Sequence, residues 1–382
     1  MKKFTQIHTL TSYPLGNPNR DDQGRPKSGI YGNVPRLRIS SQSFRRAVRV
    51  SALFADAFDG RIGTRTRRLG DEIIEMLIGK GHDEQKAIEI AIRVCALFGK
   101  TEGDLAVENG EGKKSSKSNA KNGNTIAGKL LRTSARTKQM AFISPDERAL
   151  ANELALNLAQ GTEIDAREMN SMALRRVDGA VDLALFGRML AHAPGYNREA
   201  ALQVGHLITT HRAVVEDDYF TAVEELNGIG NDANTGSGFL DEQGFGSGVF
   251  YGYFCIDMSQ LIENLDGDAE IAARTAEILT EAVATVTPSG KKSAYAHQTL
   301  ASFVMVETGN RQPRNLVEAF LKPITGQNLM ADSISALRRH VDLQDRFYGR
   351  MADERAVLDM SDPDSAGIEV LKNLARSSAL NG

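Results

Sequence analysis

Apolar residues recur along this chain with two different periods, and each period indicates one kind of element. Apolar and β-branched runs bounded by turn residues predict strands at 4–12, 249–256 and 299–306. The middle run, Val-Phe-Tyr-Gly-Tyr-Phe-Cys-Ile, is apolar and aromatic at both even and odd positions. That pattern is typical of a strand buried on both of its faces.

Apolar residues at helical spacing predict most of the remaining elements. A short strand and a helix are expected from about 36 to 56, and two helices over 70–98 that separate at Gly81-His82. Further helical segments are expected at 145–160, at 180–193, at 268–287 and at the C-terminal end. The predicted order favours an α+β sheet domain interrupted by insertions. It runs from a strand and a helix through a long helical insertion to a further strand and helix.

The helix within 36–56 combines good capping residues with cations. Ser40 and Ser41 are favourable N-cap residues, while Phe44, Val48 and Ala52 recur at a spacing that faces a core. Gln42, Arg45 and Arg49 share a different stripe. A helix N-terminus attracts anions, so arginines on the same helix extend an anion site. A solvated basic face is the competing interpretation.

Charge is segregated along the chain. Residues 20–49 hold eight Lys or Arg and two Asp, a local net charge of +6, whereas the whole chain carries −3 and its remainder therefore about −9. A second tract, from Lys113 to Pro145, holds eight Lys or Arg and no acid. Its first part is rich in Gly, Asn and Ser, and we expect a mobile loop there.

Composition limits the compartment and the cofactors. The two cysteines, Cys95 and Cys255, offer neither a disulfide framework nor a metal spacing, so a reducing cytoplasm is expected. The N-terminus turns polar too soon for a secretory signal, and no apolar run approaches the ~20 residues of a membrane helix. We expect no metal, no cofactor and no membrane partner.

Catalytic motifs are weak. Asp21-Asp22 is a carboxylate pair without a third carboxylate at a useful spacing, and His206 and His211 are five residues apart rather than four. Glycine-rich residues 244–248 precede a strand, whereas a dinucleotide fingerprint follows one. A binding protein is the better interpretation, with a nuclease that uses Asp21, Asp22 or His8 as the rival and a plain oligomeric scaffold as a third possibility.

Several fragments together resemble the backbone subunit of the type I-E CRISPR Cascade surveillance complex, the CasC family. They begin with Asn-Arg-Asp-Asp at 19–22 and Arg-Leu-Arg-Ile-Ser-Ser-Gln-Ser at 36–43, and they continue at 45–47, 177–180, 187–189, 206–211, 220–223 and 246–251. The similarity is weak over 60–170 and loose in the C-terminal third.

The resemblance implies a hand-like α+β fold and a non-catalytic role. The palm, a modified RNA-recognition-motif (ferredoxin-like) sheet, is expected at 1–58, 175–212 and 248–382, with helical fingers at 59–174 and a β-hairpin thumb at 213–247. The implied partners are crRNA, target DNA, further copies of the chain in a helical filament, and other Cascade subunits.

The resemblance also assigns contacts. RNA contacts in the palm are expected at Asn19, Arg20, Lys27, Ser40, Gln42, Arg45 and Arg49, and the same segment adds Arg38, Ser41 and Arg46. Met189 is implied as a wedge beside the RNA, although an ordinary core residue is the alternative. Thumb contacts fall on Tyr219, Phe220 and Thr221. The resemblance also implies target DNA contacts in the fingers, placed here by location and charge rather than by an aligned motif, with a solvated basic loop as the competitor; the residues are Lys113, Lys114, Lys117, Lys121, Lys129, Arg132, Arg136 and Lys138.

Overall fold

The chain forms two compact units. The computed structural model describes residues 3–103, 125–126, 129–222 and 239–380. The sheet unit comprises Met1–Ala57, Leu202–Ile262 and Asp268–Gly382, and the helical unit comprises Phe58–Ala201 and Glu263–Gly267.

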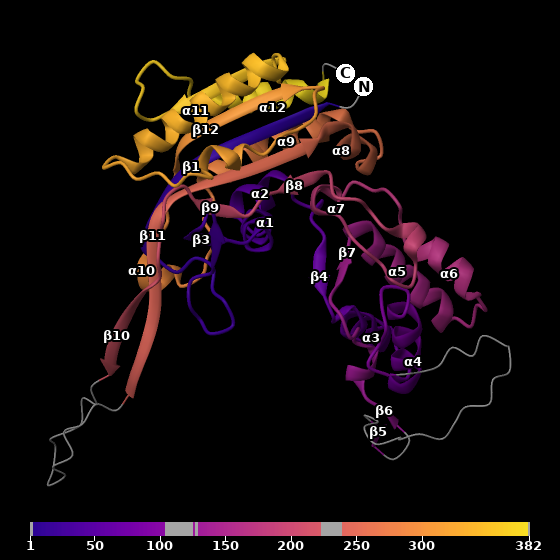
Figure 1. Cartoon of the computed structure of the whole chain (residues 1–382). Coiled ribbons are helices and arrows are strands. Elements are labelled where there is room, and N and C mark those ends of the chain that lie inside the picture. Colours follow the sequence, from indigo (N-terminus) through magenta and orange to yellow (C-terminus); the bar gives the residue numbers. More distant parts are fainter. Residues whose placement is uncertain (1–2, 104–124, 127–128, 223–238, 381–382) are drawn as a thin grey trace, which may run out of the picture. The chain divides into compact units, whose positions relative to one another are not determined.

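An antiparallel sheet is the centre of the sheet unit (Figure 1). Its strand order is β13-β12-β1-β11-β9-β3-β2, and β8 and β10 also pair with β11. The strands are β1 (Phe4–Gly16), β2 (Ser28–Tyr31), β3 (Val34–Ile39), β8 (Leu202–Val204), β9 (Leu207–Thr209), β10 (Glu216–Ala222), β11 (Phe239–Asp257), β12 (Ala301–Gly309) and β13 (Glu354–Asp359).

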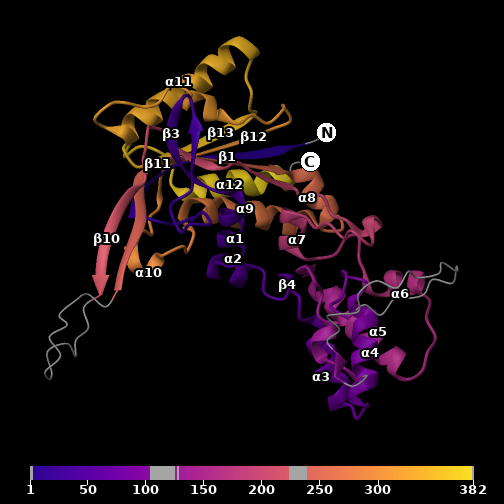
Figure 2. The same cartoon turned by 60° about the horizontal axis from the view of Figure 1, so that its bottom comes forward.

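Helices cover both faces of this sheet, which is why β1 and β11 are apolar on both sides. On one face, Leu10 and Tyr251 pack with Leu337 of α11. On the other face, Phe44 of α1 contacts Phe254, with ring centroids 5.1 Å apart, and α9 and α12 pack nearby. Figure 2 shows α11 on one side of the strands and α9 and α12 on the other. The helices are α1 (Ser41–Arg49), α2 (Ala52–Ala57), α8 (Met258–Asn264), α9 (Ala269–Thr285), α10 (Lys292–Tyr295), η3 (Leu316–Phe320), α11 (Leu329–Tyr348) and α12 (Ile368–Leu380).

The hairpin of β10 and β11 extends away from the sheet (Figure 1). Glu216 pairs with Phe245, and the register continues to Ala222 opposite Phe239. β11 then runs without interruption into the sheet, where Phe250 pairs with Thr11 of β1. The expected thumb boundary at 247 therefore lies inside one continuous strand.

The helical unit has a separate core, built from apolar residues of α3, α4, α5 and α6 such as Ile73, Ile88, Leu154 and Met169. Its elements are β4 (Thr64–Thr66), α3 (Leu69–Gly79), α4 (Glu84–Cys95), β5 (Thr125–Ile126), β6 (Lys129–Leu130), η1 (Arg132–Ala135), β7 (Ala141–Ile143), α5 (Pro145–Ala159), α6 (Ala166–Ala173), α7 (Val181–Phe186) and η2 (Pro194–Tyr196).

Residues 175–201, which we expected in the palm, belong to this helical unit. The physical reason is a buried ion pair between the Arg188 guanidinium and Glu147 of α5, whose second hydrogen bond measures 2.8 Å. The helix expected over 180–193 is also shorter, because α7 ends at Phe186 and Gly187 has a φ of +72°.

Candidate nucleic-acid interface

The head of α1 is capped by three surrounding side chains. The Ser40 hydroxyl accepts a hydrogen bond from the Ser43 N–H (3.3 Å), and the Ser40 N–H donates to Asn19 Oδ1 (2.8 Å). The Ser41 N–H donates to His206 Nδ1 (3.0 Å). We expected these N–H groups to be open to an anion, but Ser41 and Ser43 are already satisfied. Among the described residues only the Gln42 N–H of this first turn has no acceptor.

The loop before β2 is closed by its own backbone, and this places Arg20 beside α1. The Lys27 N–H donates to the Asn19 carbonyl (2.9 Å), and the Asp21 N–H donates to the Arg25 carbonyl (2.8 Å). Arg20 pairs with Pro26 as an isolated bridge. Because the Asn19 side chain also accepts a hydrogen bond from the Ser40 N–H, the loop and the head of α1 are joined directly.

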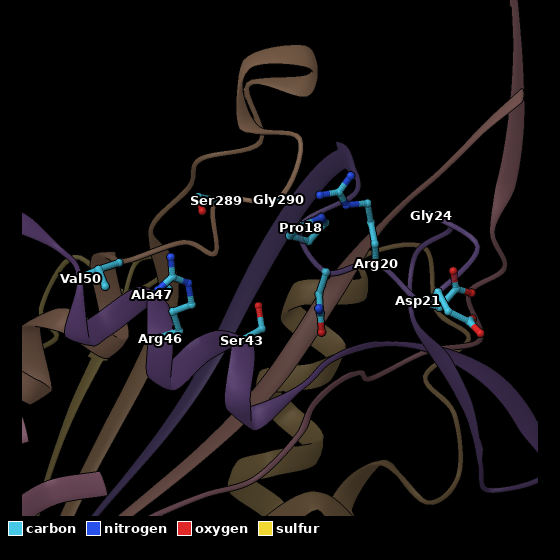
Figure 3. Close-up of a pocket in the computed structure, with 12 residues that line it drawn as sticks. Pro18, Arg20, Asp21, Gly24, Ser43, Arg46, Ala47, Val50, Ser289 and Gly290 are labelled. Atoms are coloured by element: carbon cyan, nitrogen blue, oxygen red, sulfur yellow. The ribbon is translucent and has the colours of Figure 1, made fainter. Parts of the chain in front are cut away.

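A pocket of about 520 Å³ lies between this loop, α1 and the segment at Ser289–Gly290. Ser43 and Arg46 of α1 line it together with Val50, which caps the end of that helix, and Arg20 lines it from the loop (Figure 3). Both arginines are exposed. Across the described ranges, neither arginine has a carboxylate within ion-pair distance, although Asp21 and Asp22 also line the pocket and balance its formal charge.

The expected stripe of Gln42, Arg45 and Arg49 lies on the adjacent side of α1. Gln42 is exposed, whereas Arg45 and Arg49 are half-buried. Arg45 donates one long hydrogen bond, 3.4 Å, to the Leu202 carbonyl, and burial lowers the pKa of its guanidinium. Phe44 and Val48 face the core as predicted, but Ala52 does not, because α1 ends at Arg49 and Ala52 begins α2.

His206 joins β9 to this surface, a role that sequence spacing did not reveal. Its Nε2 lies 3.4 Å from Arg38 Nη1, on the side opposite the Ser41 cap. Burial and the charges of Arg38 and Lys27 lower the pKa of His206. Since Nδ1 accepts from Ser41, a neutral ring carries its proton on Nε2. Nε2–H and Arg38 then present two donors side by side.

Two arginines of the basic segment do not contribute free charge. Arg36 is buried and donates to the carbonyls of Thr209 (2.9 Å) and Phe320 (2.8 Å). One guanidinium nitrogen of Arg25, Nη2, donates to both carboxylate oxygens of Asp217 in β10, at 2.6 and 2.8 Å. The local excess of positive charge is therefore smaller than the sequence count, and one ion pair links the loop to the hairpin.

The residues on which a nuclease would depend, Asp21, Asp22 and His8, do not form a common site. The Asp21 carboxylate accepts hydrogen bonds from the N–H groups of Gln23 and Arg25, both at 2.9 Å, so it orders its own loop. His8 is fully buried in the sheet, where its Nδ1 contacts the Tyr251 hydroxyl at 2.9 Å. The described residues contain no group of three or more His, Cys, Asp or Glu able to hold a metal.

Met189 is exposed, at 81 %, and is held by a rigid support rather than packed in a core. Gly187 before it requires glycine: its φ is positive, and a Cβ would lie 2.9 Å from the Ala200 nitrogen. Arg188, buried against Glu147, anchors the loop from below. The sequence alone favoured a core residue here, so the structure removes that alternative.

The three hairpin residues lie on two faces. Tyr219 and Thr221 are exposed and share one side of β10, whereas Phe220 is half-buried on the other side. A strand alternates its side chains, so the three residues do not form one contact surface.

The basic tract of the helical unit is partly neutralised. Arg132 pairs with Glu75 and Glu84, and Arg136 pairs with Asp71 at 2.9 Å. Lys138 is exposed. Lys129 lies in β6, whereas Lys113, Lys114, Lys117 and Lys121 are outside the residues that the structure describes.

An antiparallel sheet covered by helices, with an exposed cationic surface at one helix head, defines an α+β protein suited to binding a polyanion. The chain belongs to the CT1975-like protein family, whose model matches residues 5–380. This is the CasC backbone family of type I-E Cascade, so the resemblance seen in the sequence is confirmed.

Solved structures agree with this assignment. A chain of a structure described as "CRISPR RNA-guided surveillance complex, pre-nicking" is 26% identical with a TM-score of 0.77, and the match covers 98% of this chain and 100% of that chain. A chain of a "CRISPR RNA-guided surveillance complex" is 23% identical with a TM-score of 0.67, covering 99% and 100%, and supports the fold alone. A comparison with curated proteins finds no match. In the described part of the chain, no helix has the length and hydrophobicity to cross a membrane.

Proposed function

We propose that this protein is the non-catalytic backbone subunit of a cytoplasmic type I-E Cascade and that it holds guide RNA by its phosphates. The observation that carries the proposal is the surface at the head of α1. Arg20, Arg38 and Arg46 stand there without an ion-pair partner among the described residues, next to the N–H of Gln42, and the Asp21 carboxylate that shares the pocket accepts hydrogen bonds from its own loop. Such groups bind phosphates without reading sequence.

The arrangement separates holding the guide from reading the target. Phosphate contacts fix the register of the RNA, and base pairing by the guide supplies sequence recognition. In this proposal the sheet unit is the palm, a modified RNA-recognition-motif sheet, and the helical unit supplies the fingers. The β10–β11 hairpin is the thumb, which reaches the next copy along the RNA and kinks the strand.

Contacts with target DNA complete the proposal. Lys138 and the lysines at 113–121 attract the duplex, while Arg132 and Arg136 contribute less because acids of the helical unit balance their charge. The protein then supports R-loop formation together with other Cascade subunits.

The test is the RNA that the protein carries when it is expressed with a CRISPR array. We expect a discrete species of repeat-plus-spacer length, reduced in an Arg20→Gln/Arg46→Gln variant. Arg339→Gln is the matched control, because Arg339 is exposed on α11, on the opposite face of the sheet. Absence of RNA from the wild type, or equal RNA in both variants, would refute the proposal.

A further inference from the structure

His206 lies at a break between two short strands of the sheet. β8 ends at Val204 and β9 begins at Leu207, and both strands pair with β11. Between them, the Gly205 N–H donates to the Tyr253 carbonyl of β11 at 2.9 Å. A local irregularity in a sheet can re-aim one side chain. The His206 ring therefore stands on a support that is fixed to the sheet, and neither sequence spacing nor the family resemblance assigned it a role.

The contacts of the His206 ring leave a donor without an acceptor. Nδ1 accepts from the Ser41 N–H at 3.0 Å, and a backbone N–H can only donate, so the proton of the neutral ring is on Nε2. Arg38 Nη1, which also can only donate, lies 3.4 Å from Nε2. An imidazolium would place a proton against the Ser41 N–H, and burial and the charges of Arg38 and Lys27 lower the pKa of His206. Two donors are therefore adjacent, with no acceptor between them among the described residues.

Both donors are fixed to the same sheet. Arg38 of β3 pairs with Ile208 of β9, two residues after His206. The Arg38 N–H donates to the Lys27 carbonyl at 2.8 Å, which holds Lys27 beside them. The side-chain charges that act on His206 are those of Arg38 and Lys27, and no acid is among them. An anionic oxygen is the group that accepts from two such donors next to a further cation.

We propose that His206 and Arg38 together bind one phosphate oxygen of the guide RNA, and that His206 sets the position of this phosphate relative to the head of α1. Nε2–H and the guanidinium share the oxygen, while Nδ1 continues to accept from Ser41. Because the neutral ring donates without adding charge, His206 gives the contact direction and Arg38 gives it charge. The proposal rests on the proposed function, since it defines one phosphate subsite on that surface.

A double-mutant cycle with labelled single-stranded RNA tests whether the two residues act on one oxygen. His206→Asn removes the Nε2–H but keeps an amide oxygen that can accept from the Ser41 N–H. This variant and Arg38→Gln should each weaken RNA binding by roughly three- to tenfold. The double variant should bind little more weakly than the poorer single variant, because the first change already loses the shared contact. Combined with Arg20→Gln instead, His206→Asn should multiply the two losses, since neither His206 nor Arg38 lines the pocket that contains Arg20.

Salt dependence separates this contact from a purely structural cap. A neutral ring releases no counterion, so His206→Asn should leave the slope of log affinity against log salt unchanged, whereas Arg38→Gln should reduce it by about 0.7. His340→Asn is the matched control, because His340 lies on α11, on the opposite face of the sheet from α1. The proposal is overturned if His206→Asn binds like His340→Asn or if its loss multiplies with that of Arg38→Gln. It is also overturned if His206→Asn lowers the slope, which would show that the histidine only caps α1 and keeps its arginines in place.

Nuclear magnetic resonance of protein with nitrogen-15 in its histidines measures the tautomer directly. The ring whose signals are missing from His206→Asn is that of His206. In the free wild-type protein we expect its proton on Nε2, and a short oligo-uridine should shift the Nε2 resonance more than that of Nδ1. A proton on Nδ1 in the free protein, or a larger shift at Nδ1, would contradict the proposal.

Failure of this subsite and failure of the proposed function are separable in the same binding assay. If Arg20→Gln/Arg46→Gln loses RNA binding while His206→Asn does not, the subsite is wrong and the phosphate-holding surface stands. If only His206→Asn and Arg38→Gln lose binding, the subsite stands and the role of the pocket at Arg20 is wrong. If the wild type binds no RNA, both fail.

Discussion

Replacing Arg45 and Arg46 of α1 by Gln is expected to flatten the salt dependence of guide-RNA binding. Arg46 is exposed and Arg45 is half-buried, and no carboxylate in the described part of the chain pairs with either. Their charges are therefore available to phosphates without first breaking an ion pair. Gln retains part of each side-chain stem, so the packing of Phe44 and Val48 beneath them is preserved.

The magnitude follows from counterion release. Each phosphate contact contributes about 0.7 to the slope of log affinity against log salt for a single strand, so losing two reduces the slope by about 1.4. Between roughly 50 and 200 mM salt, the difference in affinity between wild type and variant should then shrink by about sevenfold. Each single variant should show a shrinkage of about two- to threefold.

Filter binding of labelled guide RNA over a salt series measures these slopes, with Arg339→Gln as the control whose slope stays at the wild-type value. The same experiment with an unrelated RNA of equal length should give the same change, because phosphates carry no sequence. Unchanged slopes in the double variant, or a loss confined to one RNA sequence, would refute the reasoning.

Three further predictions concern other parts of the molecule. Arg25→Asp breaks the exposed Arg25–Asp217 pair and should change the free energy of unfolding by less than about 1 kcal/mol. It should nevertheless weaken RNA binding, and adding Asp217→Arg should restore that binding. If binding is not restored, the pair does not position the hairpin. Burial lowers the pKa of His8 below its unfolded value of 6.5, so the unfolded chain binds the extra proton first as the pH falls. The unfolding temperature of the wild type should therefore fall as the pH drops below 6.5, and it should fall less in His8→Gln. An equal fall in both proteins would show that His8 is not the cause. Four lysines are neutralised in the third prediction: Lys113, Lys114, Lys117 and Lys121. The assembled complex should then capture duplex target more slowly, most of all at low salt, while its guide-RNA content stays the same. A fall in guide-RNA content would mean that these lysines belong to the RNA site.

Local pattern predicted the strongest elements of this fold. Residues 4–12 and 249–256 are strands, extended in the structure to β1 and β11, and the separation at Gly81-His82 falls between α3 and α4. β13 was missed, because Glu354–Asp359 is polar on its exposed side and only pairing with β12 makes it a strand. The extent of the helical unit was missed too, since the Arg188–Glu147 pair joins residues far apart in sequence.

In the candidate site too, local features could be predicted from the sequence and long-range pairings could not. Capping residues and helical stripes are local, so the Ser40 cap and the inward-facing Phe44 and Val48 followed from spacing. Whether each cation is buried, ion-paired or exposed did not follow from spacing, because it depends on partners elsewhere in the chain. Arg36 is buried by carbonyls from distant segments, and Arg132 is balanced by Glu75 and Glu84. A count of charges along the sequence contains none of these pairings.

The most direct test of the central claim is to map where the guide RNA touches the protein. Copies assembled on a guide RNA containing photoreactive 4-thiouridine can be crosslinked and the attached peptides identified by mass spectrometry. The account predicts crosslinks in the segment 19–49 and on the β10 side of the hairpin, at a repeating interval along the RNA. Crosslinks that avoid 19–49, or that fall at random intervals along the RNA, would contradict it.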